Sequence, residues 1–209
     1  MLEIIKSGGP VMYPLIICSF ISLMVIIERM IFWIKIEIRR DKKLVFKVLD
    51  LSRDGDWDSI RSLVQNSKNH IVRILIIGIV HREFSMIKAM ESAAADEVKK
   101  MQRFMGVLDT IIMVAPLLGI LGTVVGIISS FDMLGEMGIG DPRAVTGGIA
   151  QALISTASGL TIAIVTVFPF NYFNSRIDYA VLAIEKYATS LEIVYEKQMS
   201  GGVSESIQA

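Results

Sequence analysis

The chain has 209 residues, of which 53% are hydrophobic and 20% charged, and its mean hydropathy is +0.57. Soluble domains carry about 25% charged residues, so this composition excludes an ordinary soluble domain and requires lipid or a partner to cover apolar surface. Basic and acidic residues balance at 21 each, but fifteen of the basic residues lie between residues 35 and 103. The single cysteine, Cys18, lies in an apolar run, which excludes a disulfide or a cysteine-based metal site within one chain.

Three apolar segments are long enough to cross a bilayer: residues 11–34, 106–134 and 148–173. About 20 apolar residues span the hydrocarbon layer as a helix. The first segment is too long for the core of a signal peptide, and no small-residue cleavage site follows it. A fourth patch at 71–80 has about half the required length, so we predict that it is a helix outside the membrane, packed on its neighbours.

The distribution of basic residues predicts the orientation. The segment 35–105 holds fifteen of them, whereas the loop 135–147 holds only Arg143. By the positive-inside rule, segment 35–105 and the tail 174–209 lie in the cytoplasm, and residues 1–10 and the loop lie outside.

The cytoplasmic segments show apolar residues at helical spacing. We predict a helical hairpin from 35–51 and 59–82, joined by the turn-like stretch 52–58. The first part of residues 85–131 contains no proline or glycine that would end a helix. A proline further along is tolerated within a membrane helix, so one helix is expected to run from the cytoplasm into the bilayer. Residues 176–198 resemble a solvated helix. The fold class is therefore an all-α membrane protein with three transmembrane helices extended by long cytoplasmic helices.

The second and third spans each gather small and weakly polar residues on one face. Small residues let helices approach closely in lipid. In one interpretation, both faces simply pack against the first span of a monomer. In the other, several copies place these faces around an axis in a closed ring and enclose a space lined by hydroxyls and amides. The residues on these faces include Pro116, Gly119, Gly122, Thr123, Gly126, Gln151, Ser155, Thr156 and Gly159.

Ionisable residues are rare in the three spans. A charged side chain is energetically costly inside a bilayer, so each such residue is a candidate functional residue. Glu28 and Arg29 lie near the inner end of the first span, and we expect them to pair or to reach the interface. Asp109 lies at the inner end of the second span, at a position suited to the mouth of a pore.

No catalytic constellation is visible. The sequence contains no H-E-x-x-H, G-x-S-x-G or Walker lysine. A membrane-embedded enzyme is therefore disfavoured, and we predict neither enzymatic activity nor a metal or other cofactor. Any work that the protein supports must draw on an ion gradient or on a partner.

Two motifs resemble the MotA/TolQ/ExbB proton channel family: APLLGILGTVVG at 115–126 and GIAQALISTASGL at 148–160. The pair Glu28 and Arg29 fits this resemblance too. The chain resembles ExbB and TolQ more than MotA-type stators, which usually have a fourth span.

The resemblance implies a pentamer that encloses two transmembrane helices of an ExbD- or TolR-like partner, whose aspartate carries protons. It also implies a bacterial inner-membrane motor driven by the proton motive force, which energises a TonB- or TolA-like protein across the periplasm; nucleic acid is not an expected partner. By position, Thr123 and Thr156 correspond to pore-lining threonines of the family. Ser155, Gln151 and Asp109 are further candidates for the ion pathway.

One residue departs from the resemblance. ExbB and TolQ typically carry glutamate where this chain has Gln151. A glutamine side chain cannot titrate, although its amide can orient water. Conduction would then rely on the partner's aspartate, or the member would use another ion or have a specialised role. A non-conducting scaffold for a partner helix is the alternative function.

Overall fold

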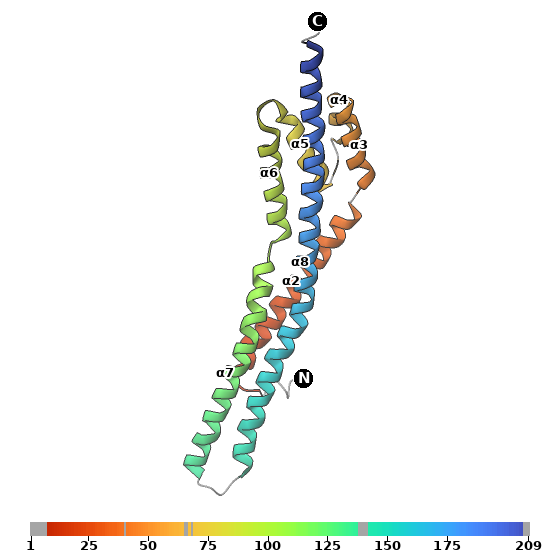
Figure 1. Ribbon diagram of the computed structural model, residues 1–209. Helices are drawn as coiled ribbons and strands as arrows, with labels where there is room; N and C mark the ends of the chain where they lie inside the picture. Colours follow the sequence, from red (N-terminus) through yellow and green to blue (C-terminus); the bar gives the residue numbers. More distant parts are fainter. Residues whose placement is uncertain (1–7, 40, 65–66, 68, 138–141, 207–209) are drawn as a thin grey trace. The chain divides into compact units, whose positions relative to one another are not determined.

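The computed structural model describes residues 8–39, 41–64, 67, 69–137 and 142–206, and all the regular elements in these ranges are helices (Figure 1). This confirms the predicted all-α class. The helices, in chain order, are α2 (Met12–Ile38), α3 (Lys42–Arg53), α4 (Trp57–Val64), α5 (His70–Val80), α6 (Arg82–Met101), α7 (Met105–Met137) and α8 (Pro142–Ser206).

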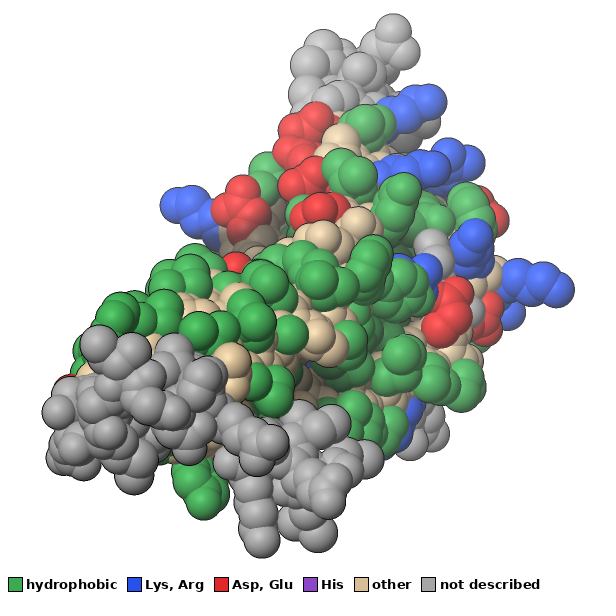
Figure 2. Space-filling view, turned by 90° about the horizontal axis from the view of Figure 1, so that it is seen from below, with side chains coloured by type: hydrophobic (Ala, Val, Ile, Leu, Met, Phe, Trp, Pro, Cys, Tyr) green, Lys and Arg blue, Asp and Glu red, His purple; other side chains and the backbone are tan. Residues whose placement is uncertain are grey.

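Three of these helices are long and apolar enough to cross a membrane. The candidate spans are Met12–Ile38, Met105–Asp132 and part of the stretch Thr146–Lys197. Much of their apolar surface is exposed within one chain, as at Phe20, Met24 and Phe168, and Figure 2 shows hydrophobic side chains over a large part of one face. Lipid or other chains must cover this surface, in agreement with the composition.

The chain divides into two compact units. The span unit comprises Met1–Met30 and Phe104–Phe173, and the peripheral unit comprises Ile31–Arg103 and Asn174–Ala209. The helices α2 and α8 each contribute residues to both units.

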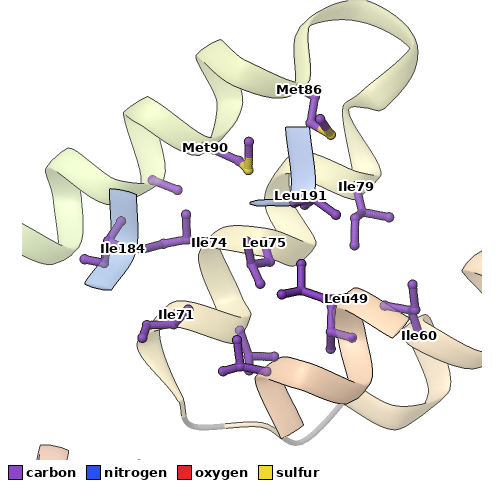
Figure 3. Packing of buried hydrophobic residues seen from close by; sticks show 14 residues of the cluster. Leu49, Ile60, Ile71, Ile74, Leu75, Ile79, Met86, Met90, Ile184 and Leu191 are labelled. Atoms are coloured by element: carbon purple, nitrogen blue, oxygen red, sulfur yellow. The ribbon is translucent and has the colours of Figure 1, made fainter. Parts of the chain in front are cut away.

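The peripheral unit has a core of bulky aliphatic side chains arranged around α5. Helix α5 is apolar on most of its surface, and α3, α4 and α6 pack against it and cover that surface. Helix α8 contributes Ile184 and Leu191 to the same cluster (Figure 3). The patch at 71–80 is thus a packed helix rather than a short span. The buried residues of α5 in this cluster are Ile71, Val72, Ile74, Leu75 and Ile79.

The predicted hairpin of two helices was wrong in its boundaries. Helix α2 continues to Ile38, and a separate helix begins at Lys42, where the Asp41 side chain accepts a hydrogen bond from Leu44 N at 3.1 Å. The expected helix at 59–82 is divided between α4 and α5, and Asn69 caps α5 by accepting a hydrogen bond from Ile71 N at 3.0 Å. Side-chain capping of free N–H groups starts a new helix in both places.

The prediction of one continuous helix over 85–131 was also wrong. Helix α6 ends at Met101, and α7 begins at Met105. Between them Phe104 has a φ of 64°, a left-handed conformation that ends helical geometry. No proline or glycine lies between Met101 and Met105, and Gly106 follows only inside the first turn of α7.

The third span and the tail, which were predicted as successive segments, form one helix. Helix α8 extends over 65 residues and passes through Pro169. At its start, α8 takes up part of the predicted loop 135–147, and α7 takes up another part by reaching Met137. Residues 138–141 of that loop lie outside the described residues.

Candidate functional site

The candidate site is the seam where α7 and α8 pack together in the span unit. Glycine allows the two backbones to approach here. A Cβ atom added to Gly119 would lie 3.0 Å from the Cα of Thr156, and one added to Gly126 would lie 2.9 Å from the carbonyl oxygen of Gly148. Both positions exclude a side chain unless a helix moves, because the neighbouring atoms belong to backbone.

Two more glycines belong to this seam: Gly122 lies between the first two, and Gly159 extends the seam toward Ala115. A Cβ on Gly122 would lie 2.6 Å from the Cβ of Ser155, and one on Gly159 would lie 3.2 Å from the Cα of Gly119. Pro116 lies one residue beyond the buried Ala115, and α7 continues through it. The small faces of the second and third spans therefore meet within one chain.

Thr156 links the two helices directly. Its hydroxyl donates a hydrogen bond of 2.8 Å to the carbonyl oxygen of Gly119, 37 residues away in the sequence. The missing side chain at Gly119 makes this approach possible. A threonine hydroxyl has one donor and two acceptor positions, so Thr156 uses its donor in the seam and retains acceptor capacity for water or a protonated group.

Thr123 lies beside an apolar pocket of about 330 Å³ between α7 and α8. Its hydroxyl donates a hydrogen bond of 2.6 Å to the carbonyl oxygen of Ile120 in its own helix. The threonine therefore turns its donor away from the pocket and leaves the pocket suited to an apolar group. The other residues lining the pocket are Ile127, Ser130, Phe131, Ile149, Ala152 and Leu153.

The remaining candidates occupy different surroundings. Ser155 is fully buried against Gly122, and its hydroxyl donates to Ala152 O at 2.8 Å. Asp109 is exposed and lies 14 residues before Thr123 on α7, which corresponds to about 21 Å along a helix axis. The structure therefore brings Ser155 into the seam and leaves Asp109 outside it, six residues before Ala115 and about 9 Å from it along the helix axis.

Gln151 lies against the N-terminal turn that precedes α2. A Cβ added to Gly9 would lie 2.7 Å from the Cδ of Gln151, and Gly9 has a φ of +74° that glycine adopts readily. One added to Gly8 would lie 3.3 Å from Cγ2 of Ile154. The sequence reasoning missed this contact, although the run Gly8-Gly9-Pro10 before an apolar segment is typical of a tight turn.

Glu28 and Arg29 form a bidentate pair on α2. The distances are 2.5 Å from Arg29 Nε to Glu28 Oε2 and 2.7 Å from Arg29 Nη2 to Glu28 Oε1. Arg29 is 1% exposed and its guanidinium lies 5.9 Å from the centre of the Phe104 ring. The arginine therefore pairs within the protein and does not reach solvent.

Within the described residues, no group of three or more His, Cys, Asp or Glu side chains is placed to hold a metal ion. The polar groups in the seam of α7 and α8 are hydroxyl, amide and backbone groups. Such groups order water and bind neutral or protonated partners without fixing a charge.

A profile of the MotA/TolQ/ExbB proton channel family matches residues 66–186, more than half of the chain. The chain belongs to this family. The matched region includes the seam of α7 and α8, and the family is one of channels rather than of enzymes. Membership and the three candidate spans identify a multi-pass membrane protein.

Individual relatives carry ExbB or TolQ names. A biopolymer transport protein of Synechocystis sp. designated ExbB-like 3 is 37% identical over 198 residues, 91% of this chain and 93% of that protein. TolQ of the Pseudomonas aeruginosa Tol-Pal system is 31% identical over 112 residues, 54% of this chain and 48% of TolQ. ExbB of Xanthomonas campestris is 41% identical over 96 residues, 46% of this chain and 38% of that protein.

Proposed function

We propose that the protein is the ExbB/TolQ-like subunit of an ion-driven motor in a bacterial inner membrane. The observation that carries this proposal is the weakly polar seam of α7 and α8, in which Thr156 joins the helices through Gly119 within the region matched by the family. The proton motive force would supply the energy.

The proposed assembly is a ring, with five copies as the expected number. The ring encloses helices of an ExbD- or TolR-like partner and energises a TonB- or TolA-like protein across the periplasm. Large exposed apolar side chains on all three spans support assembly in lipid, because a single chain leaves them uncovered. The names of the ExbB and TolQ relatives support this type of partner.

The proposed topology has a periplasmic N-terminus and a cytoplasmic C-terminus. Segment 35–105 and the tail 174–209 lie in the cytoplasm, and the loop 135–147 lies in the periplasm. The concentration of fifteen basic residues between 35 and 105 supports this orientation.

In this mechanism the titrating carboxyl group belongs to the partner. Thr123, Thr156 and Gln151 would order water or hydrogen-bond the partner's carboxyl group, the buried Ser155 would hold α7 and α8 together beside them, and Asp109 would lie toward the inner mouth. None of the first four side chains changes charge near neutral pH, so the chain provides a path without a proton-binding group in the seam.

Ion flux into liposomes tests this proposal. The full chain is reconstituted with and without an ExbD-like partner, and Gln151→Glu is measured beside the native protein. We expect flux in the native protein that requires the partner. The absence of flux with the partner present would contradict a conducting role.

A scaffold that holds a partner helix without conducting ions is the second candidate function. It is favoured by the neutral Gln151 and by the donors of Thr123 and Thr156, which are both engaged with backbone carbonyl groups. Partner binding in the native protein, combined with flux only in the Gln151→Glu variant, would support this function.

A further inference from the structure

Five exposed cations follow the apolar part of the first span, and we call them the basic collar. Their side chains form no ion pair with any described residue. The nearby acids are engaged elsewhere, because Glu37 pairs with Arg176 and Asp41 caps α3. The basic collar consists of Lys35, Arg39, Lys42, Lys43 and Lys47.

Helix α3 fixes the direction of part of this collar. Its buried residues Val45, Val48 and Leu49 belong to the core of the peripheral unit. Lys42, Lys43 and Lys47 are exposed. The apolar residues of α3 hold it on the core, so its cations face outward and remain available to an anion.

Exposed apolar side chains are interleaved with these cations. Ile38 is 79% exposed and lies next to Arg39, and Phe46 is 53% exposed and lies next to Lys47. A surface that alternates cations with Ile and Phe fits the boundary between headgroups and acyl chains, where an apolar body and a charged tip are both accommodated.

The chain itself keeps the collar close to the bilayer. Lys35 directly follows Ile34, where the predicted apolar span ends, and Lys42 lies eight residues after Ile34. Clusters of four to eight Lys and Arg immediately beside a transmembrane helix bind anionic lipid, with a gain of about fivefold in affinity per cation.

We propose that the basic collar binds the headgroups of anionic phospholipids in the leaflet that residue 35 enters. The ligand chemistry is a phosphate diester with net negative charge, presented at high density by the membrane surface. Nucleic acid has a similar charge, but the adjoining span and the exposed Ile38 and Phe46 favour lipid. The proposal does not require that the protein conducts ions.

The test uses the full chain in liposomes of phosphatidylcholine with a minor fraction of phosphatidylglycerol. Spin-labelled forms of both lipids report which lipid occupies the protein surface. The variant K42Q/K43Q removes two collar charges, and K88Q/K197Q removes two exposed charges that lie 17 residues before Met105 and 24 residues after Phe173. Circular dichroism confirms that each variant keeps its helices, which lysine and glutamine favour about equally.

We expect the native protein to prefer phosphatidylglycerol, with a preference that falls at least twofold in K42Q/K43Q and at high salt. The K88Q/K197Q variant should keep the native preference. Equal association of both lipids with the native protein, or equal losses in the two variants, would overturn the proposal. Collar-dependent binding of single-stranded DNA without any lipid preference would overturn it as well.

Discussion

The two units of this protein bury their helices by different means. The seam of the span unit is built from glycine, serine and threonine, so the backbones of α7 and α8 approach closely and Thr156 bonds to Gly119 O at 2.8 Å. The core of the peripheral unit is built from Ile, Leu, Val and Met around α5. Lipid tails are as apolar as the side chains themselves, so burying an apolar side chain between helices gains little free energy in a bilayer. Close packing and interhelical hydrogen bonds stabilise the helix contact there instead.

This difference decides which substitutions are harmful in each unit. Removing bulk should damage the peripheral core, because burial of apolar area stabilises it in water. Adding bulk should damage the seam, because no space separates the backbones there.

The largest effect is expected in the peripheral core. Leu75→Ala should lower the free energy of unfolding of this unit by about 2–5 kcal/mol, because Leu75 is 1% exposed and its removal leaves a cavity. Chemical denaturation monitored by Trp57 fluorescence measures the change. Ile193→Ala, at an exposed position of α8, is the control and should cost much less; equal losses would show that the core is not organised around α5.

An opposite substitution tests the seam. Gly119→Val should destabilise the association of α7 and α8 by about 1–3 kcal/mol, because overpacking forces the backbones apart. Resistance to denaturation in detergent reports the effect. Gly106→Val is a matched control because no atom lies within 4 Å of a Cβ at Gly106, and comparable behaviour of the two variants would remove the close approach from the explanation.

The contact between Gly9 and Gln151 should not tolerate a larger side chain at Gly9. Gly9→Val should displace the N-terminal turn, both because Gln151 lies against it and because Gly9 has a positive φ. Protease protection of the residues before α2 measures this change. Gln151→Ala should relieve the steric part of the effect but not the backbone strain, so no rescue at all would show that contact with Gln151 is unimportant.

The smallest effect concerns a charge outside the membrane. Hydrogen bonds from the Ser59 side chain and backbone lower the pKa of Asp56, which is exposed at the start of α4. A lowered pKa in the folded state contributes stability above the ordinary pKa of 3.8 and loses it as the pH falls through the folded value. Asp56→Asn should therefore flatten the dependence of stability on pH below about 4, whereas an unchanged profile would contradict this role.

The features that depend on local pattern were predictable from the sequence. Three long apolar runs indicated three spans, since hydrophobic length alone decides whether a helix can cross a bilayer. The patch at 71–80 was correctly predicted as a packed helix because it is too short to span. The small faces of the second and third spans followed from helical periodicity.

The features that depend on tertiary context were not predictable. Phe104 breaks the helix before α7 in a left-handed conformation that a phenylalanine rarely adopts, and its ring lies near the buried Arg29. The division of residues 59–82 at Asn69 depends on a side-chain cap, which Asn forms in many non-helical settings as well. The contact between Gly9 and Gln151 joins residues far apart in the sequence.

The most direct test of the central claim is partner-dependent ion flux through Thr156→Val compared with Thr161→Val. Both variants exchange a hydroxyl for a methyl group on α8, but Thr161 bonds only to Ala157 O in its own helix, whereas Thr156 bridges to Gly119. We predict that both variants assemble and that only Thr156→Val loses most of the flux. Native flux in Thr156→Val, or equal losses in both variants, would contradict a role of the seam in conduction.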